Sequence, residues 1–109
     1  FYDNIKEKKD VDKMFRHIVL YKLKDRSESS AKALYEKFLT MEGKIPYIKE
    51  MSVGCDTLRL DRSFDVSLSI IFDSKEDFLA YKEYPYHRDQ IVPYVHSVIE
   101  QAVSVDSLT

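Results

Sequence analysis

Four stretches of the chain alternate between apolar and polar positions with a period of two, the pattern of β-strands. The clearest are residues 15–24 and 64–72, and weaker ones cover residues 47–55 and 95–105. The first stretch carries apolar residues on both of its faces, which predicts a central strand covered on both sides. The stretch 47–55 is polar or small on one face, which predicts a strand at the edge of the sheet.

Two further stretches repeat their apolar residues at helical spacing. The first follows serines at positions 27–30, which suit an N-cap, and Gly43 suits its C-terminal end. The second begins at residues 74–77, which resemble a capping box, and Pro85 ends or bends it before a short helical stretch toward Pro93. The order is therefore βαββαβ. It predicts an α+β, ferredoxin-like fold with an antiparallel sheet and both helices on one face.

The other face of this sheet has no helix to cover it. With 109 residues the chain holds one core, and folding at this size buries only about two thirds of the surface that the unfolded chain exposes. The first strand is nevertheless apolar on both faces. Packing the open face against the same face of a second copy would bury these side chains. We therefore expect a homodimer formed through the open sheet face.

Composition limits the partners further. Lys and Arg total 17 against 19 Asp and Glu, so no cationic field exists to bind nucleic acid or an anionic membrane, and apolar runs are far shorter than the roughly 18 residues that span one. Cys55 is the only cysteine, which favours a reducing compartment, and we expect the cytoplasm. The histidines are scattered and no glycine-rich phosphate loop occurs, so neither a metal nor a cofactor is expected.

Several short motifs follow one another in order along this layout. They lie at residues 17–24, 45–46, 54–56, 72–77 and 81–87. Together they resemble the stress-responsive α/β-barrel (Dabb) family, from about Met14 to about Asp106. Residues 14–109 are thus the expected domain, and residues 1–13 an N-terminal extension, either native or left over from cloning. The resemblance implies a dimeric α+β barrel in which each subunit keeps a pocket between its sheet and its helices.

Tyr81 and His87 match, in type and in their spacing of six positions, the working pair of a plant polyketide cyclase in that family. That enzyme uses neither metal nor organic cofactor. The resemblance implies that His87 abstracts an acidic C–H proton while Tyr81 orients the carbonyl and its developing enolate. Six positions on an unbroken helix lie about 240° apart, so the two side chains converge only if Pro85 breaks it. Both residues also suit structural roles, Tyr81 in the core and His87 as a cap or as a partner of a backbone carbonyl.

Three more positions are expected at the pocket. His17 matches a family position on the first strand and faces the same side as Tyr21, either as a hydrogen-bond donor to the ligand or as a structural histidine. Val66 stands where the cyclase has a histidine, which makes the pocket more apolar. Tyr84 likewise replaces the histidine of the family's usual His-Pro. No role in the pocket is expected for His96, which suits the surface or a dimer contact.

Three functions remain open at this point. The leading hypothesis is a protein that binds a small apolar or aromatic molecule in the pocket, with cofactor-free acid/base chemistry at Tyr81 and His87. The second is a stress-linked binding or interaction protein without turnover. The third, by analogy of fold, is a haem-binding, mono-oxygenase-like protein in which His87 is an axial ligand, and a Soret shift on adding haem would identify it.

Overall fold

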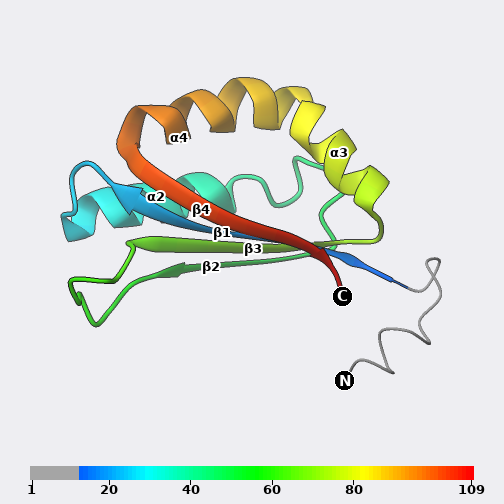
Figure 1. Cartoon of the computed structure of the whole chain (residues 1–109). Helices are drawn as coiled ribbons and strands as arrows, with labels where there is room; N and C mark the ends of the chain where they lie inside the picture. The colour runs from blue at the N-terminus through cyan, green and yellow to red at the C-terminus, as the bar shows by residue number, and fades with distance from the viewer. Residues whose placement is uncertain (1–12) are drawn as a thin grey trace, which may run out of the picture.

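In the computed structural model, which describes residues 13–109, β1 (Phe15–Leu23) lies in the interior of a four-stranded antiparallel sheet. It pairs on one side with β3 (Val66–Phe72) and on the other with β4 (Ile99–Leu108). The strand β2 (Glu50–Cys55) pairs with β3, giving the order β2-β3-β1-β4 (Figure 1). The predictions of a central first strand and an edge second strand are confirmed.

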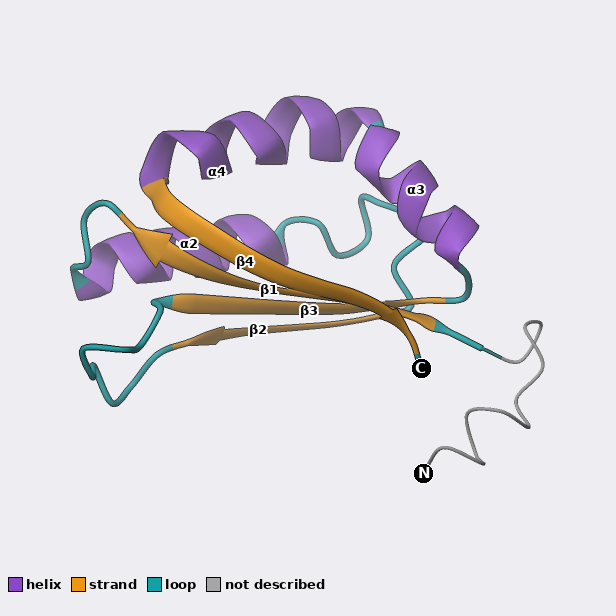
Figure 2. Ribbon diagram, viewed as in Figure 1, coloured by secondary structure: helices purple, strands orange, loops and turns teal. Residues whose placement is uncertain are grey.

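The helices of residues 13–109 all lie on one face of this sheet, as Figure 2 shows. They are α2 (Glu28–Leu39), α3 (Lys75–Glu83), the π-helical turn η2 (Tyr86–Ile91) and α4 (Val92–Val98). The fold is therefore ferredoxin-like, as expected, with η2 and α4 forming the additional helical stretch before the last strand. None of the helices in residues 13–109 is both long enough and apolar enough to cross a membrane.

Local capping explains where the helices begin and end. The hydroxyl of Ser27 accepts a hydrogen bond from the Ser30 backbone N–H, and that of Ser74 accepts one from Asp77 N–H. Each bond satisfies one of the N–H groups that the first turn of a helix leaves free. Beyond the end of α2, Gly43 adopts a φ of 78°, in the left-handed region that favours glycine. Both predicted helix starts are confirmed.

The predicted start of the last strand was wrong. The expected strand began at Val95, but this residue lies in α4 and is buried, and the strand begins only at Ile99. Ile91 and Val95 are four positions apart, so both reach the core from one face of a continuous helical stretch. A short apolar series with this spacing fits a helix as well as a strand.

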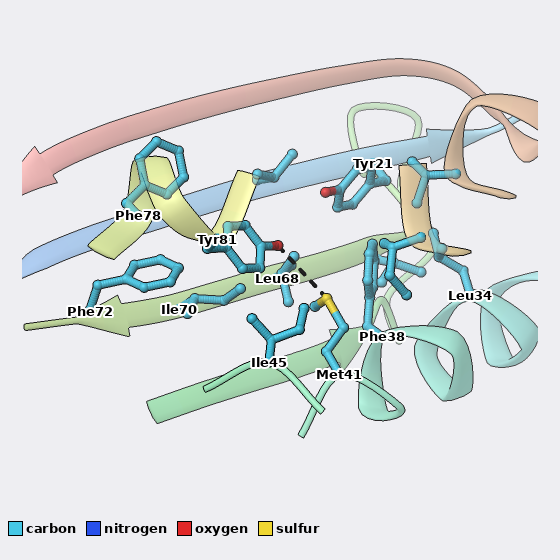
Figure 3. Packing of buried hydrophobic residues seen from close by; sticks show 14 of the residues in the cluster. Tyr21, Leu34, Phe38, Met41, Ile45, Leu68, Ile70, Phe72, Phe78 and Tyr81 are labelled. Carbon is cyan, nitrogen blue, oxygen red and sulfur yellow. Dashed lines mark hydrogen bonds between the residues drawn. The ribbon is translucent and has the colours of Figure 1, made fainter. Parts of the chain in front are cut away.

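The two faces of the sheet differ in what covers them. Alternate residues of β1 and β3 point toward the helices and form the core together with the buried side of each helix (Figure 3). The opposite face carries exposed apolar side chains: Leu20, Val103 and Val105 are 41%, 42% and 63% exposed. The open apolar face that the sequence predicts is therefore present in the single chain.

One buried carboxylate joins the loop between β2 and β3 to the end of β1. Asp65 is fully buried and accepts hydrogen bonds from Leu23 N–H at 2.8 Å, Arg26 Nε at 3.1 Å and Arg59 Nη1 at 2.9 Å. Burial by itself would raise the pKa of Asp65, but the Leu23 N–H and the two guanidinium groups outweigh it and lower the pKa. Asp65 therefore stays ionised in the folded protein.

Candidate functional site

A cavity of about 240 Å³ lies between the helix-facing side of β1, the strand β4 and the segment from α3 to α4. Most of its wall is apolar, with Phe38, Ile91 and Val95 among the lining side chains. Its polar side chains come from His17 and Tyr21 on β1, from Ser104 on β4, and from three residues of the helical segment, Tyr81, His87 and His96. An apolar pocket with a few converging polar groups is the usual form of a small-molecule site.

Tyr81 and His87 are brought together by a break in the helix. The helix α3 ends at Glu83, and Tyr84 adopts an extended conformation with a ψ of 134° before Pro85 begins the next turn. The rings of Tyr81 and His87 consequently lie with their centroids 4.2 Å apart, at an interplanar angle of 41°. This is the convergence that requires a break at Pro85, because an unbroken helix would point the two side chains apart.

The surroundings of His87 hold it in one neutral form. Its Nδ1 lies 3.2 Å from the carbonyl oxygen of Lys82, and because a carbonyl only accepts, Nδ1 carries the hydrogen and Nε2 keeps its lone pair. Burial lowers the pKa of His87, the carbonyl of Lys82 partly opposes this, and repulsion from His17 and Lys82 lowers it further. At neutral pH the side chain is therefore an uncharged base.

Tyr81 and Tyr21 contribute two phenol side chains to the lining of the same cavity. Tyr81 is buried, and its hydroxyl donates to the sulfur of Met41 at 3.8 Å (Figure 3). A thioether is a weak acceptor, so a ligand carbonyl would be a better partner for this hydroxyl. Burial raises the pKa of both tyrosines well above the usual range, for Tyr81 with a contribution from Tyr21. Both remain protonated donors.

A second histidine of the cavity pairs with a carboxylate. His17 on β1 lies directly opposite Asp106 on β4, and its Nδ1 contacts the Oδ1 of Asp106. Its ring packs against Phe78, at 4.8 Å between centroids, and lies 6.2 Å from the ring of Tyr81. No role was predicted for Asp106 from the sequence. Only the pairing of β1 with β4 brings it to His17, 89 positions away along the chain.

Not all of the residues expected at the pocket line the cavity. His17 and Tyr21 line the cavity, but Val66 does not: it lies opposite Tyr21 on β3, is 2% exposed and packs within the core. His96, for which no role in the pocket was expected, lines the cavity from α4. Within residues 13–109 no group of three or more His, Cys, Asp or Glu side chains is arranged to hold a metal ion.

Comparison with known proteins gives one family. Its sequence profile, described as the stress responsive A/B barrel domain (Dabb), matches residues 15–108 of the 109. No curated protein matches the chain.

Several solved structures share the fold. A dimeric ferredoxin-like protein of unknown function from Thermobifida fusca is 20% identical, with a TM-score of 0.77 and coverage of 89% of this chain and 92% of that one. A dimeric protein of unknown function from Bacteroides fragilis is 24% identical, with a TM-score of 0.74 over 88% and 96% of the two chains. A hydroxynitrile lyase from Passiflora edulis is 20% identical, with a TM-score of 0.71 over 90% and 94%. At these identities the likeness shows the fold alone.

Proposed function

The chain belongs to the stress-responsive A/B barrel (Dabb) family, and we propose that its cavity binds a small apolar or aromatic molecule and catalyses a cofactor-free proton transfer on it. The observation that carries this proposal is the state of His87. It is a neutral imidazole with a lone pair on Nε2, and its ring lies tilted against that of Tyr81 in the wall of an apolar cavity. A base poised in this way suits proton abstraction near neutral pH.

The lining of the cavity favours a small, uncharged ligand. No lysine or arginine contributes to it among the described residues, so a phosphate or a strongly anionic group would find no fixed positive charge there. The volume of about 240 Å³ lies below the roughly 300–1,000 Å³ of pockets for drug-sized ligands. A neutral molecule built around one ring or two small fused rings, aromatic or alicyclic, fits both properties.

The polar groups support enolisation of a carbonyl compound. The Nε2 of His87 takes the proton from the carbon next to the carbonyl. The electron pair of that C–H bond forms the C=C bond of the enolate, and the π pair of the carbonyl moves onto its oxygen. The hydroxyl of Tyr81, or that of Tyr21, stabilises the resulting enolate by donating a hydrogen bond. Neither step needs a metal or an organic cofactor. General base catalysis of this kind contributes roughly 10²–10⁴-fold to a rate.

Hydrogen exchange into a simple ketone tests the proposal without knowledge of the natural substrate. 2-Tetralone, a small aromatic ketone with acidic C–H groups, would be incubated with the protein in D₂O and followed by proton NMR. We expect loss of the signal at the carbons next to the carbonyl to be faster than in buffer alone and to saturate with ketone concentration. Saturable binding of 2-tetralone without faster exchange would instead support a binding protein without turnover, and would overturn the catalytic part of the proposal.

We also infer that two copies pair through the open sheet face. Leu20 and Val105 lie exposed on that face, beside Ile18 and Val103 in a shallow apolar groove. Such a surface is costly to leave in water. The similar proteins from Thermobifida fusca and Bacteroides fragilis are dimeric, which supports a dimer here. Because the cavity lies on the other side of the sheet, pairing leaves the helices around it uncovered by the partner.

The substitution Val105→Asp tests this interface. Burying an unpaired carboxylate costs several kcal/mol, so we expect the dissociation constant of the dimer to rise at least about 100-fold. Sedimentation velocity over a dilution series measures this change. Leu108→Asp is the matched control, because Leu108 is an exposed apolar residue of the same strand that pairs with Phe15 on the helix side. A Val105→Asp protein as dimeric as the original would exclude this face as the interface.

A further inference from the structure

Two of the histidines that line the cavity, His17 and His87, are supported by different groups. His87 donates from Nδ1 to a neutral acceptor, the carbonyl oxygen of Lys82, and is otherwise surrounded by protein that disfavours its charged form. His17 contacts a carboxylate, that of Asp106, through the same ring nitrogen. A carboxylate behind an imidazole fixes its tautomer and stabilises the imidazolium that forms when the other nitrogen accepts a proton. The two rings are therefore suited to different proton transfers.

The sheet holds His17 and Asp106 in fixed positions. They are directly opposite residues of the antiparallel pair β1–β4, so both side chains lie on the helix-facing side of the sheet. His17 lines the cavity, whereas Asp106 does not, so the carboxylate acts only through the imidazole. The groups that face His17 are Asp106 from β4, Phe78 and Tyr81 from α3, and His87 from η2.

We propose that Asp106 is a positioning residue that makes His17 a second proton acceptor, which takes the hydroxyl proton of a phenol or an enol bound in the cavity. This inference rests on the proposed function, since it requires that the cavity binds a small aromatic or enolic molecule. It adds to that function a class of ligand: one that carries an acidic hydroxyl group. It also separates the two histidines, with His87 directed at C–H and His17 at O–H protons.

The proposed step is a single proton transfer that needs no other reactant. The O–H bond of the ligand breaks, a bond forms between the proton and Nε2 of His17, and the electron pair stays on the ligand oxygen. The products are an enolate or phenolate and an imidazolium, with Asp106 on the far side of the ring. The side chain of Asp106 is 36% exposed and that of His17 15%, so solvent screens part of the attraction and the effect of Asp106 is moderate.

Absorbance of bound 4-nitrophenol measures this transfer, because the phenolate is yellow and the phenol is not. At a pH where the free probe is mostly protonated, we expect the bound probe to be enriched in phenolate. Asp106→Asn keeps the size of the side chain and removes its charge. It should lower the ratio of bound phenolate to bound phenol about tenfold, the effect of losing a hydrogen bond to a charged group. Glu100→Gln removes an exposed carboxylate from the same strand, one that pairs with Lys22, and should leave the ratio unchanged.

Two further variants identify the acceptor. His17→Gln should abolish the enrichment in phenolate while the probe still binds, and His87→Gln should retain it. In nitrogen-15 NMR of the free protein, His17 should carry its hydrogen on Nδ1, and Asp106→Ala should shift this tautomer toward Nε2–H. A change in tautomer is a readout that a merely structural role of Asp106 would not produce.

The outcomes separate this inference from the proposed function. If 4-nitrophenol binds but is not enriched in phenolate, or if the enrichment survives Asp106→Asn or depends on His87 instead, the role of His17 and Asp106 is refuted while the cavity remains a ligand site. If 4-nitrophenol does not bind at all, the ligand class proposed here is wrong. The exchange of 2-tetralone then decides separately whether the proposed function stands.

Discussion

Replacing His87 by glutamine is expected to lower the protein-catalysed deuterium exchange of 2-tetralone by about 100-fold or more, the range for loss of a general base. Glutamine keeps a side-chain N–H that can donate to the carbonyl of Lys82, so the turn η2 should keep its shape while the basic nitrogen is lost. Binding of the ketone should change much less than its turnover. The measurement is the exchange rate per protein molecule at saturating ketone, followed by proton NMR.

The pH dependence of the same reaction adds a second readout. Burial lowers the pKa of His87, so the base stays neutral below the ordinary histidine value of about 6.5 and the rate should hold to lower pH before it falls. Arg88→Gln is the control, because Arg88 is an exposed neighbour on η2 that pairs with Asp89. This variant should exchange 2-tetralone like the original protein. An unchanged rate in His87→Gln would show that His87 is not the base.

Replacing Asp65 by alanine is expected to lower the free energy of unfolding by about 3 kcal/mol at pH 7. The substitution leaves the N–H of Leu23 without its acceptor and removes the counter-charge of two guanidinium groups. Breaking a buried ion pair by removing one partner costs roughly 3–5 kcal/mol. The lower end applies here because Arg26 and Arg59 are 34% and 40% exposed and recover part of their solvation. Urea unfolding followed by circular dichroism measures the change.

The difference in free energy of unfolding between the original protein and Asp65→Ala should shrink as the pH falls. The pKa of Asp65 is lower in the folded protein than its ordinary value of about 3.9, so its stabilisation is fully present above that value and is lost as the pH falls through the folded pKa. In strong acid the two proteins should therefore have more similar free energies of unfolding. Asp61→Ala removes an exposed carboxylate from the same loop and should change stability by less than about 0.5 kcal/mol. An equally small effect of Asp65→Ala would show that the cluster does not stabilise the fold.

The parts of this fold that depend on local chemistry were predictable from the sequence. The alternation in β1 and β3, the caps at Ser27 and Ser74, and the break at Pro85 each follow from neighbouring residues. The start of β4 was not predictable in this way. Val95 fits both a helix and a strand by spacing, and its place is decided by the core onto which the continuing helix packs.

The candidate site also contains one part that neighbouring residues determine and one part that only the folded sheet determines. The pairing of Tyr81 with His87 depends on a few residues around one proline, and both the spacing and the break are visible in the sequence. Asp106 reaches His17 only through the register of two strands at opposite ends of the chain, which no local pattern encodes. For Val66 the strand was predicted correctly, but the place of the side chain was not. Val66 lies opposite Tyr21 in the buried core and does not line the cavity.

An NMR titration of the labelled protein with 2-tetralone shows directly whether this cavity is a ligand site. Ala102 lines the cavity from an exposed position on β4, so Ala102→Trp should obstruct it without disturbing the buried core. We predict saturable shifts at His87, Ile91 and Val95 in the original protein and their loss in Ala102→Trp. If these residues showed no shifts, or if the same shifts persisted in Ala102→Trp, the cavity would not be the binding site.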